Sequence, residues 1–328
     1  MKKLKGLMLL LAVTALMVVA CAPAAVLKEG VEAEVAEEQV FAEESTMEMK
    51  LEPMVFHDDM ENTLEFMEYP DAIVSLAPSA TELLFAVGAA SQVVGRDESS
   101  LYPQEAAEIS SIGSLYGDLP AESILALEPD LVLAAETISP EAVTALQGLG
   151  LQVYWQKNPT TYDDLTQNMR DIAELTGHQQ EVESIIMDLE ARISAVVETV
   201  STAESTPTVF YELDATDPSN PWTTGSGTFI DTIITMAGGT NAASELQGNY
   251  AQMSAETLIA ENPDVILLGD AAFGITPESV AERSGWDAIK AVQNEAVYPF
   301  NPNILSIPGP RLVEGLEEMA KILHPDLF

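Results

Sequence analysis

The sequence predicts an α/β protein with two Rossmann-like lobes, parallel sheets and a long rigid spine helix that joins the lobes. Three observations lead to this class: apolar β-branched runs alternate with helical segments, a helix–strand unit occurs twice, and a long amphipathic segment separates the two copies. Strands that alternate with helices imply parallel sheets covered on both faces. We expect an N-terminal lobe over 55–160, a helical connector with the spine helix over 161–204, and a C-terminal lobe over 205–328.

The chain begins with the features of an export signal. Three lysines among the first five residues precede an apolar run of 14 residues, Leu7–Ala20, and Cys21 follows directly. This run is shorter than the ~18 residues that cross a bilayer, and the layout is that of a signal peptide. The small residue before Cys21 resembles a bacterial lipobox. We expect a signal peptide over 1–20 and a lipid anchor on Cys21; an ordinary signal peptide or an uncleaved anchor is the alternative.

An acidic tether is expected over 21–54. Residues 28–54 hold nine Glu and two Lys, with apolar residues at no steady period. Self-repelling charge without an apolar stripe is typical of an extended segment, although Ala and Glu would also allow a marginal helix. A short hairpin over 55–69 is expected to lead into the first lobe.

The first lobe opens with a short β-branched run, Ala72–Leu76, predicted as a strand. Ser79 and Glu82 then have the spacing of a capping box for a helix over Leu83–Val87, which Gly88 ends. Further apolar runs are predicted as buried strands: Leu131–Ala134, Leu151–Trp155, Val209–Leu213, Val265–Leu268 and Ala296–Phe300.

An internal repeat supports two lobes of similar build. Residues 120–134 align without gaps on residues 254–268, with six identities in fifteen positions. Each copy contains a short helix, a Pro-Asp pair and an apolar strand. An offset of 134 residues is about one domain length and suggests two α/β lobes, and chance similarity between two generic units is the alternative.

A single amphipathic helix is predicted from about Gln179 onward. Its apolar residues recur at spacings of three, four and seven: Val182, Ile185, Ile186, Leu189, Ile193, Val196, Val197 and Val200. Such a helix is roughly 30 Å long. Because a stiff helical connector permits little closure, we expect the cleft between the lobes to be largely pre-formed.

Charge and motif content exclude several classes of function. The 13 basic and 53 acidic residues give a net charge of −40, and binding to nucleic-acid phosphates needs a clustered basic face. The histidines, His57, His178 and His324, are too scattered for a metal site, so no metal and no cofactor is expected. Without a G-x-S-x-G motif or a histidine beside a nucleophile, no catalytic residue is assigned. An exported enzyme or a ligand-binding sensor is a distant alternative.

Several motifs together carry a family resemblance. They are Ile73–Glu82, the helix–strand repeat, the spine helix, Gly225–Phe229 with Ala237–Gly239, and Pro308–Arg311. Over about residues 55–326 the chain resembles the substrate-binding proteins of ABC importers for vitamin B12, haem and ferric siderophores, and most of all the cobalamin binders. The resemblance implies a monomeric, exported protein, anchored by lipid to the cell membrane, that captures a ligand between two rigid lobes. It also implies delivery to a permease dimer with ATPase subunits.

The ligand is expected at the carboxyl ends of the strands. The candidate ligand-binding residues are Pro78, Ser79, Tyr102, Tyr116, Trp222, Tyr250 and Asn303. Aromatic rings in loops give broad apolar contact to a flat macrocycle. The resemblance matches Trp222 and Tyr250 to positions where cobalamin binders carry aromatic residues, and for the tyrosines packing on the lobe surface is the alternative.

Charge also bears on the ligand. Residues 71–328 hold 39 acidic and eight basic residues, and anionic ferric siderophores need converging cations, so a corrinoid such as cobalamin is favoured. Ala135 and Glu136 replace an aromatic of the family, and a ferric siderophore or haem is the alternative ligand. Arg311 is expected in the first turn of the last helix, either as a ligand contact or in a structural role.

Two glutamates are candidates for contact with the permease. Glu122 and Glu256 occupy the same place in the two copies of the repeat. Each is expected in a first helical turn, where a negative charge also stabilises the helix by about 0.3–1 kcal/mol. The resemblance implies that one surface glutamate of each lobe pairs with permease arginines, and a pseudo-twofold pair of carboxylates suits a twofold partner.

Overall fold

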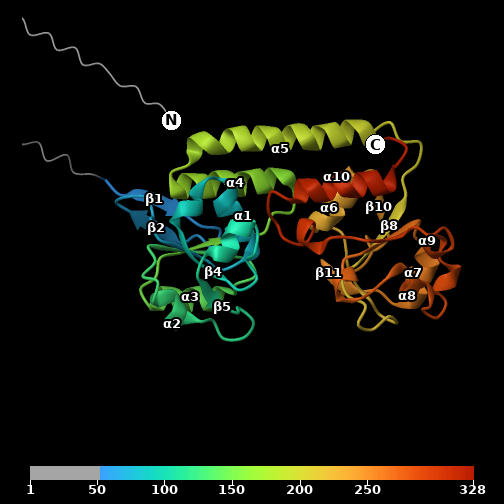
Figure 1. The fold of residues 1–328 in the computed structure, drawn as a ribbon, viewed down its shortest axis with the longest axis horizontal. Helices are drawn as coiled ribbons and strands as arrows, with labels where there is room; N and C mark the ends of the chain where they lie inside the picture. The colour runs from blue at the N-terminus through green and yellow to red at the C-terminus, as the bar shows by residue number, and fades with distance from the viewer. Residues whose placement is uncertain (1–51) are drawn as a thin grey trace, which may run out of the picture. The chain divides into compact units, whose positions relative to one another are not determined.

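The computed structural model describes residues 52–328 (Figure 1). The predicted signal peptide over 1–20, the lipidation site Cys21 and nearly all of the predicted tether over 21–54 lie outside these residues. The described part opens with an antiparallel hairpin of β1 (Met54–His57) and β2 (Thr63–Phe66), as predicted. No helix in the described part is both long and apolar enough to cross a bilayer.

The N-terminal lobe is built on a parallel sheet of five strands in the order β5-β4-β3-β6-β7. The strands are β3 (Ile73–Ser75), β4 (Val93–Asp97), β5 (Ser111–Gly113), β6 (Leu131–Ala135) and β7 (Val153–Gln156). They are connected by α1 (Pro78–Ala86), η1 (Ala89–Gln92), η2 (Gln104–Glu108), α2 (Ala121–Leu125) and α3 (Pro140–Gly148). Every residue of the central strands β3 and β6 is buried, in keeping with sequences that are apolar except for Ser75.

The C-terminal lobe has a parallel sheet of four strands in the order β10-β8-β12-β13. These are β8 (Thr208–Glu212), β10 (Thr240–Asn241), β12 (Val265–Leu268) and β13 (Val297–Pro299), and a small antiparallel pair consists of β9 (Trp222–Thr224) and β11 (Tyr250–Gln252). The helices are α6 (Phe229–Met236), α7 (Ala255–Glu261), η3 (Ala271–Phe273), α8 (Pro277–Ala281), η4 (Trp286–Ala288), α9 (Lys290–Gln293) and η5 (Pro302–Ile304).

The internal repeat corresponds to α2–β6 in one lobe and α7–β12 in the other. β6 pairs with β3 and β7, and β12 pairs in the same way with β8 and β13. The Pro-Asp pair has the same role in both copies: the Asp130 carboxylate accepts two backbone N–H bonds of 3.0 Å just before β3, and the Asp264 carboxylate accepts one of 2.9 Å from Thr208 at the start of β8. The repeat therefore marks the same structural unit in the two lobes.

Three long helices cover both sheets. The spine helix α5 (Gln179–Val200) packs on α4 (Tyr162–Thr176) and α10 (Leu312–Leu323), and Figure 1 shows it running along both. Its 22 residues make it about 33 Å long, close to the prediction. The largest buried apolar cluster joins Leu131 of β6 and Leu267 of β12 through residues such as Leu189 of α5. One continuous core thus connects the two lobes.

The predicted start of α1 is wrong in one respect. Ala77 is the N-cap of α1, and no side chain caps the helix, so Ser79 and Glu82 do not form a capping box. Pro78 at the first helical position has a fixed φ suited to starting a helix, and Glu82 is buried in an ion pair described below. The predicted end is confirmed, because Gly88 has a left-handed φ of 98°.

Candidate functional site

The carboxyl ends of the N-terminal sheet line a pocket of about 250 Å³, here called the N-lobe pocket. Its walls come from residues at or just beyond the ends of β3, β4, β5 and β6, and they include Pro78, Ser99 and Tyr116. The pocket brings together two of the predicted ligand-binding residues, Pro78 and Tyr116. Tyr116 is 89% exposed, so most of its ring is available to a ligand.

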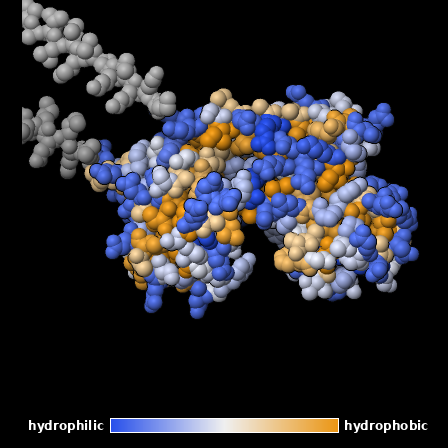
Figure 2. All heavy atoms as spheres, viewed as in Figure 1, coloured by the Kyte–Doolittle hydropathy of each residue, from blue (hydrophilic) through white to orange (hydrophobic). Residues whose placement is uncertain are grey.

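A second pocket, of about 300 Å³, is lined by both lobes and is here called the interlobe pocket. The N-terminal lobe contributes Glu136 and residues 157–160, and the C-terminal lobe contributes residues 227–230, Tyr250 and Pro308. Figure 2 shows the surface hollowed between the lobes on the side away from α5. A molecule in this hollow would contact both lobes at once.

Trp222 and Tyr250 lie on the two strands of the small antiparallel sheet. Trp222 in β9 is opposite Gln252 in β11, and Tyr250 is opposite Thr224. The backbone N–H of Trp222 donates to the carbonyl of Asp214, two residues beyond β8, at 2.8 Å. The pair of strands therefore carries two aromatic side chains at the carboxyl edge of the main sheet, where Trp222 is 43% and Tyr250 is 59% exposed.

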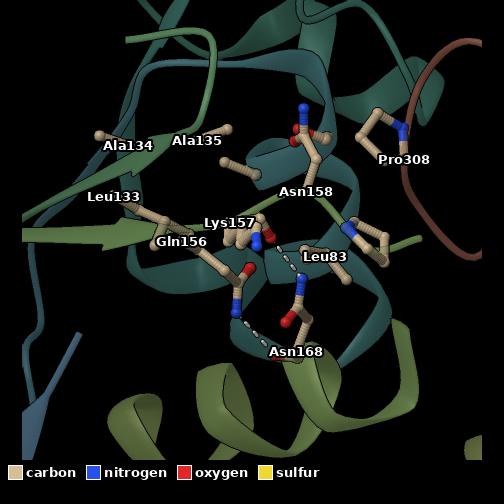
Figure 3. A pocket seen from close by; sticks show the side chains of 12 residues that line it. Leu83, Leu133, Ala134, Ala135, Gln156, Lys157, Asn158, Asn168 and Pro308 are labelled. Atoms are coloured by element: carbon tan, nitrogen blue, oxygen red, sulfur yellow. Dashed lines mark hydrogen bonds between the residues drawn. The ribbon is translucent and has the colours of Figure 1, made fainter. Parts of the chain in front are cut away.

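Ser79 is separated from these rings. It is 6% exposed and lines a small space together with Leu83, Ala135 and Pro308, which are labelled in Figure 3. This space has about 10 Å³, enough for about one water molecule. The structure therefore places Ser79 behind the cleft wall, next to the point where Pro308 meets α1.

Tyr102 and Asn303 also lie apart from the two cleft pockets. The ring of Tyr102 is stacked under the guanidinium of Arg311, with 3.8 Å from the ring centroid to Cζ, in a separate pocket of about 280 Å³. Asn303 is an exposed residue of η5, and its N–H donates to the side chain of Asn301 at 3.1 Å. Neither residue lines the N-lobe pocket or the interlobe pocket.

Two further residues at the carboxyl edges of the sheets escaped the sequence analysis. Phe273 follows β12, at the carboxyl edge of the C-terminal sheet, and is 87% exposed. The signal that could have found it is an aromatic residue in the segment after the apolar run Val265–Leu268. Lys157 follows β7 and lines the interlobe pocket and the small space beside it.

Within residues 52–328 the arginines are all engaged by other groups. Four form ion pairs: Arg170–Glu183, Arg192–Glu317, Arg283–Glu212 and Arg311–Glu82. Arg96 donates to the backbone carbonyls of residues 97, 98, 106 and 107. Lys157 is thus the cation that lines the interlobe pocket without a carboxylate within ion-pair distance in this part of the chain.

Electrostatics link the two walls of the interlobe pocket. Partial burial raises the pKa of the Tyr250 phenol, and the negative charge of Glu136 from the opposite lobe raises it further. The phenol is therefore protonated at physiological pH and can donate a hydrogen bond. In the described residues, no group of three or more His, Cys, Asp or Glu side chains is arranged to hold a metal ion.

Glu122 and Glu256 lie in the first turns of α2 and α7, and both are exposed. Neither forms an ion pair with another residue of the described part. They occupy equivalent positions in the two lobes because α2–β6 and α7–β12 are equivalent units. Both carboxylates are available to a partner.

Comparisons with known proteins agree with this architecture. Residues 73–303 match the family of periplasmic binding proteins. The ABC transporter substrate-binding lipoprotein YvrC of Bacillus subtilis is 30% identical over 281 residues, which cover 84% of this chain and 87% of that protein. A cobalamin-binding protein of Halobacterium salinarum is 28% identical over 284 residues, which cover 83% of this chain and 74% of that protein.

A solved structure has the same fold. The periplasmic haem-binding protein RhuT from Roseiflexus, in its apo form, superposes with a TM-score of 0.67 at 28% identity and covers 79% of this chain and 99% of that one. Substrate-binding proteins of this family act outside the cytoplasm, bind small ligands, work with permease and ATPase components and are not enzymes. This chain therefore belongs to the periplasmic binding protein family and is an ABC-type substrate-binding protein with two α/β lobes.

Proposed function

We propose that this chain is an exported, lipid-anchored protein that captures cobalamin or a related corrinoid between its lobes and delivers it to an ABC permease. One observation carries the proposal: both lobes present exposed aromatic rings at the carboxyl edges of their sheets, and few cations lie there. Tyr116 lines the N-lobe pocket, and Tyr250 lines the interlobe pocket with Trp222 on the neighbouring strand. The similarity to a cobalamin-binding protein supports the same ligand.

The chemistry of the cleft suits a large, nearly neutral macrocycle. Aromatic rings supply apolar contact area at little cost in conformational entropy, and the neutral phenol of Tyr250 can donate to an amide oxygen at the edge of a corrin ring. A ferric siderophore that carries several negative charges needs converging cations. Because the arginines of the described part are already engaged, Lys157 is the cation left to the interlobe pocket.

Haem is the second candidate. The similarity to a haem-binding protein favours it, as do the exposed phenols of Tyr116 and Tyr250, since a tyrosinate can be an axial ligand of haem iron. The two propionate groups of haem would then compete for an ion pair with Lys157. A shift of the Soret band on adding haemin, lost in the Tyr116→Phe or Tyr250→Phe variant, would favour haem over a corrinoid.

Anchoring and delivery complete the proposal. A lipid on Cys21 would hold the chain at the membrane, and a single monomer would dock on the permease dimer through Glu122 of one lobe and Glu256 of the other. The exposure of both carboxylates and their equivalent places in the two lobes support this role. The name of the lipoprotein relative supports the anchor.

The experiment is a parallel titration of the purified protein with cyanocobalamin, cobinamide, haemin and a ferric siderophore, followed by calorimetry and by thermal unfolding. We expect the corrinoids to bind, and ligand at 100 times Kd should raise the free energy of unfolding by about 2.7 kcal/mol. Binding of haemin or the siderophore alone would refute the corrinoid assignment and leave the family unchanged.

A further inference from the structure

A buried ion pair connects the two lobes at the edge of the cleft. Glu82 lies in α1 of the N-terminal lobe, and Arg311 directly precedes α10 in the C-terminal lobe. Arg311 Nε donates to Glu82 Oε2 at 3.0 Å, and Arg311 Nη2 donates to the other carboxylate oxygen. The side chain of Glu82 is only 2% exposed and that of Arg311 only 11%. A two-point contact between a planar guanidinium and a carboxylate fixes orientation as well as distance.

The carboxylate meets the edge of the guanidinium, and one of its faces is occupied as well. Its Cζ lies 3.8 Å from the ring centroid of Tyr102, which belongs to the loop between β4 and β5. Gly309 packs against the pair, because a Cβ added there would lie 3.0 Å from Glu82 Oε2 and would force the carboxylate to move. Glu82, Tyr102 and Arg311 form what is here called the interlobe joint.

The joint is continuous with the cleft walls along the chain. Leu305, Ser306 and Pro308, just before Gly309, line the interlobe pocket. Ser99, three residues before Tyr102, lines the N-lobe pocket. A displacement of the joint would therefore move a wall of each pocket.

A second anchor holds the same segment. The Tyr162 hydroxyl of α4 donates to the carbonyl of Leu312 at 2.8 Å, one residue beyond Arg311. This bond holds the start of α10 against the connector, whereas the joint holds it against α1 of the N-terminal lobe. The start of α10 is thus held from two sides, by the connector and by the joint, and the joint is the contact that ties it to α1.

We propose that Arg311 is a positioning residue that sets the angle between the lobes, and so the width of the cleft, through its contacts with Glu82 and Tyr102. The inference rests on ligand capture between the lobes and on no particular ligand. It assigns Tyr102 to the joint rather than to the ligand. The 229-residue separation of Glu82 and Arg311 explains why the sequence alone does not reveal the pair.

The chain provides a matched control for a buried ion pair. Arg283 donates to both oxygens of Glu212, at 2.5 and 2.8 Å, and its Cζ lies 4.5 Å from the ring centroid of Trp286. The side chains are 7% and 0% exposed. Arg283 and Glu212 both belong to the C-terminal lobe, so this pair has the chemistry of the joint but does not connect the lobes.

The test is a distance measurement between the lobes without any ligand. Spin labels are placed on cysteines introduced for the exposed residues Ala145 in α3 and Glu261 in α7, in the full chain with Cys21→Ser. Electron–electron double resonance then gives the distance distribution. We expect one narrow distribution for the parent, a broader and shifted one for Arg311→Met, and an unchanged one for Arg283→Met, although both variants lower the melting temperature.

Ligand affinity provides the second readout. With whichever ligand the titration identifies, Arg311→Met should weaken binding by about tenfold or more. The affinity of Arg311→Lys should lie between those of the parent and Arg311→Met, because an ammonium keeps the charge but cannot form the two-point contact. An unchanged distance distribution in Arg311→Met would overturn the proposal, because the Glu82–Arg311 pair would then contribute to stability alone. Failure of the corrinoid assignment would leave the distance result intact.

Variants of Tyr102 provide a second test if Arg311→Met does not fold. Tyr102→Ala removes the stacking and leaves the ion pair, so we expect a moderately broadened distribution, whereas Tyr102→Phe keeps the ring and should match the parent. A loss of ligand affinity in Tyr102→Ala with the parent's distance distribution would instead make Tyr102 a ligand contact, against the proposal.

Discussion

Glu128 and Asn262 occupy equivalent positions in the two lobes, and both have a left-handed backbone, with φ of 47° and 50°. Glu128 lies between α2 and β6, and Asn262 lies between α7 and β12. Asparagine tolerates this conformation better than glutamate because its short side chain can hydrogen-bond locally. The same turn is therefore built from a favourable residue in one lobe and a strained one in the other.

Relieving this strain should stabilise the protein. We expect Glu128→Asn to raise the free energy of unfolding by about 0.5–1 kcal/mol, as measured by urea denaturation. Glu128→Gln is the matched control, since it removes the charge but keeps the unfavourable conformation, and it should leave stability nearly unchanged. An equal gain in both variants would show that charge, and not backbone strain, limits this turn.

The two repeat glutamates should act in delivery alone. The double variant Glu122→Lys/Glu256→Lys is expected to abolish transport in cells and to keep the parent's ligand affinity, because both residues are exposed and neither lines a described pocket. The control is Glu141→Lys/Glu278→Lys, which reverses exposed charges in the first turns of α3 and α8 and should transport normally. Loss of ligand affinity in the first variant would contradict the docking role.

The exposed rings should carry much of the ligand affinity. Tyr116→Ala, Trp222→Ala, Tyr250→Ala and Phe273→Ala are each expected to weaken ligand binding by about tenfold, which corresponds to about 1.4 kcal/mol. Phe328→Ala removes a half-exposed ring at the C-terminus and should have no effect on the affinity. Calorimetry measures the loss of affinity in each variant. An affinity equal to the parent's in Phe273→Ala would show that Phe273 does not contact the ligand.

One ion pair should make stability depend on pH. The hydrogen-bonded contact with Arg192, at 2.8 Å, lowers the pKa of the Glu317 carboxyl below its ordinary value of 4.5. A lowered pKa in the folded state contributes stability above about pH 4.5, and this contribution is lost as the pH falls through the lowered pKa.

We therefore expect Glu317→Gln to be less stable than the parent by about 0.2–1 kcal/mol at pH 7, measured by chemical denaturation. The difference should disappear in acid and shrink in high salt, because the pair is about one-third exposed. A difference that persists at low pH would mean that packing of the side chain, and not its charge, is responsible.

Much of the fold could be predicted because its signals are local. The strands β6 and β12 are continuous apolar runs, β8 contains the apolar run Val209–Tyr211, and α5 carries a regular apolar stripe. The strands β4 and β5 were not predicted because β5 has only three residues and β4 contains polar ones. Arg96 is buried by hydrogen bonds to the carbonyls of Ala106 and Ala107, and Asp97 by hydrogen bonds from Ser99 and Ser100. Such contacts give no periodic pattern in the sequence.

The candidate site was predictable only in part. Tyr116 follows β5, and Trp222 and Tyr250 were expected in loops but lie on the short strands β9 and β11 at the same edge, so the carboxyl-edge rule identified all three. Tyr102 and Ser79 satisfied the same rule, yet the structure stacks one on Arg311 and buries the other behind the cleft wall. Position along the chain locates the edge of a sheet but not the direction in which a side chain points.

Local signals in the sequence were enough to predict the class of the protein: two α/β lobes with one repeated unit, a helical spine and an excess of acidic residues. Helix and strand periods and the Pro-Asp pair act over a few residues. The partner of Glu82 and the roles of Tyr102 and Arg311, by contrast, depend on how distant segments pack. The pattern Ser79–Glu82 fits a capping box locally, but burying a carboxylate beside an arginine 229 residues away is a property of the packed chain. Close approach of distant segments, which no local pattern encodes, therefore defines the angle between the lobes.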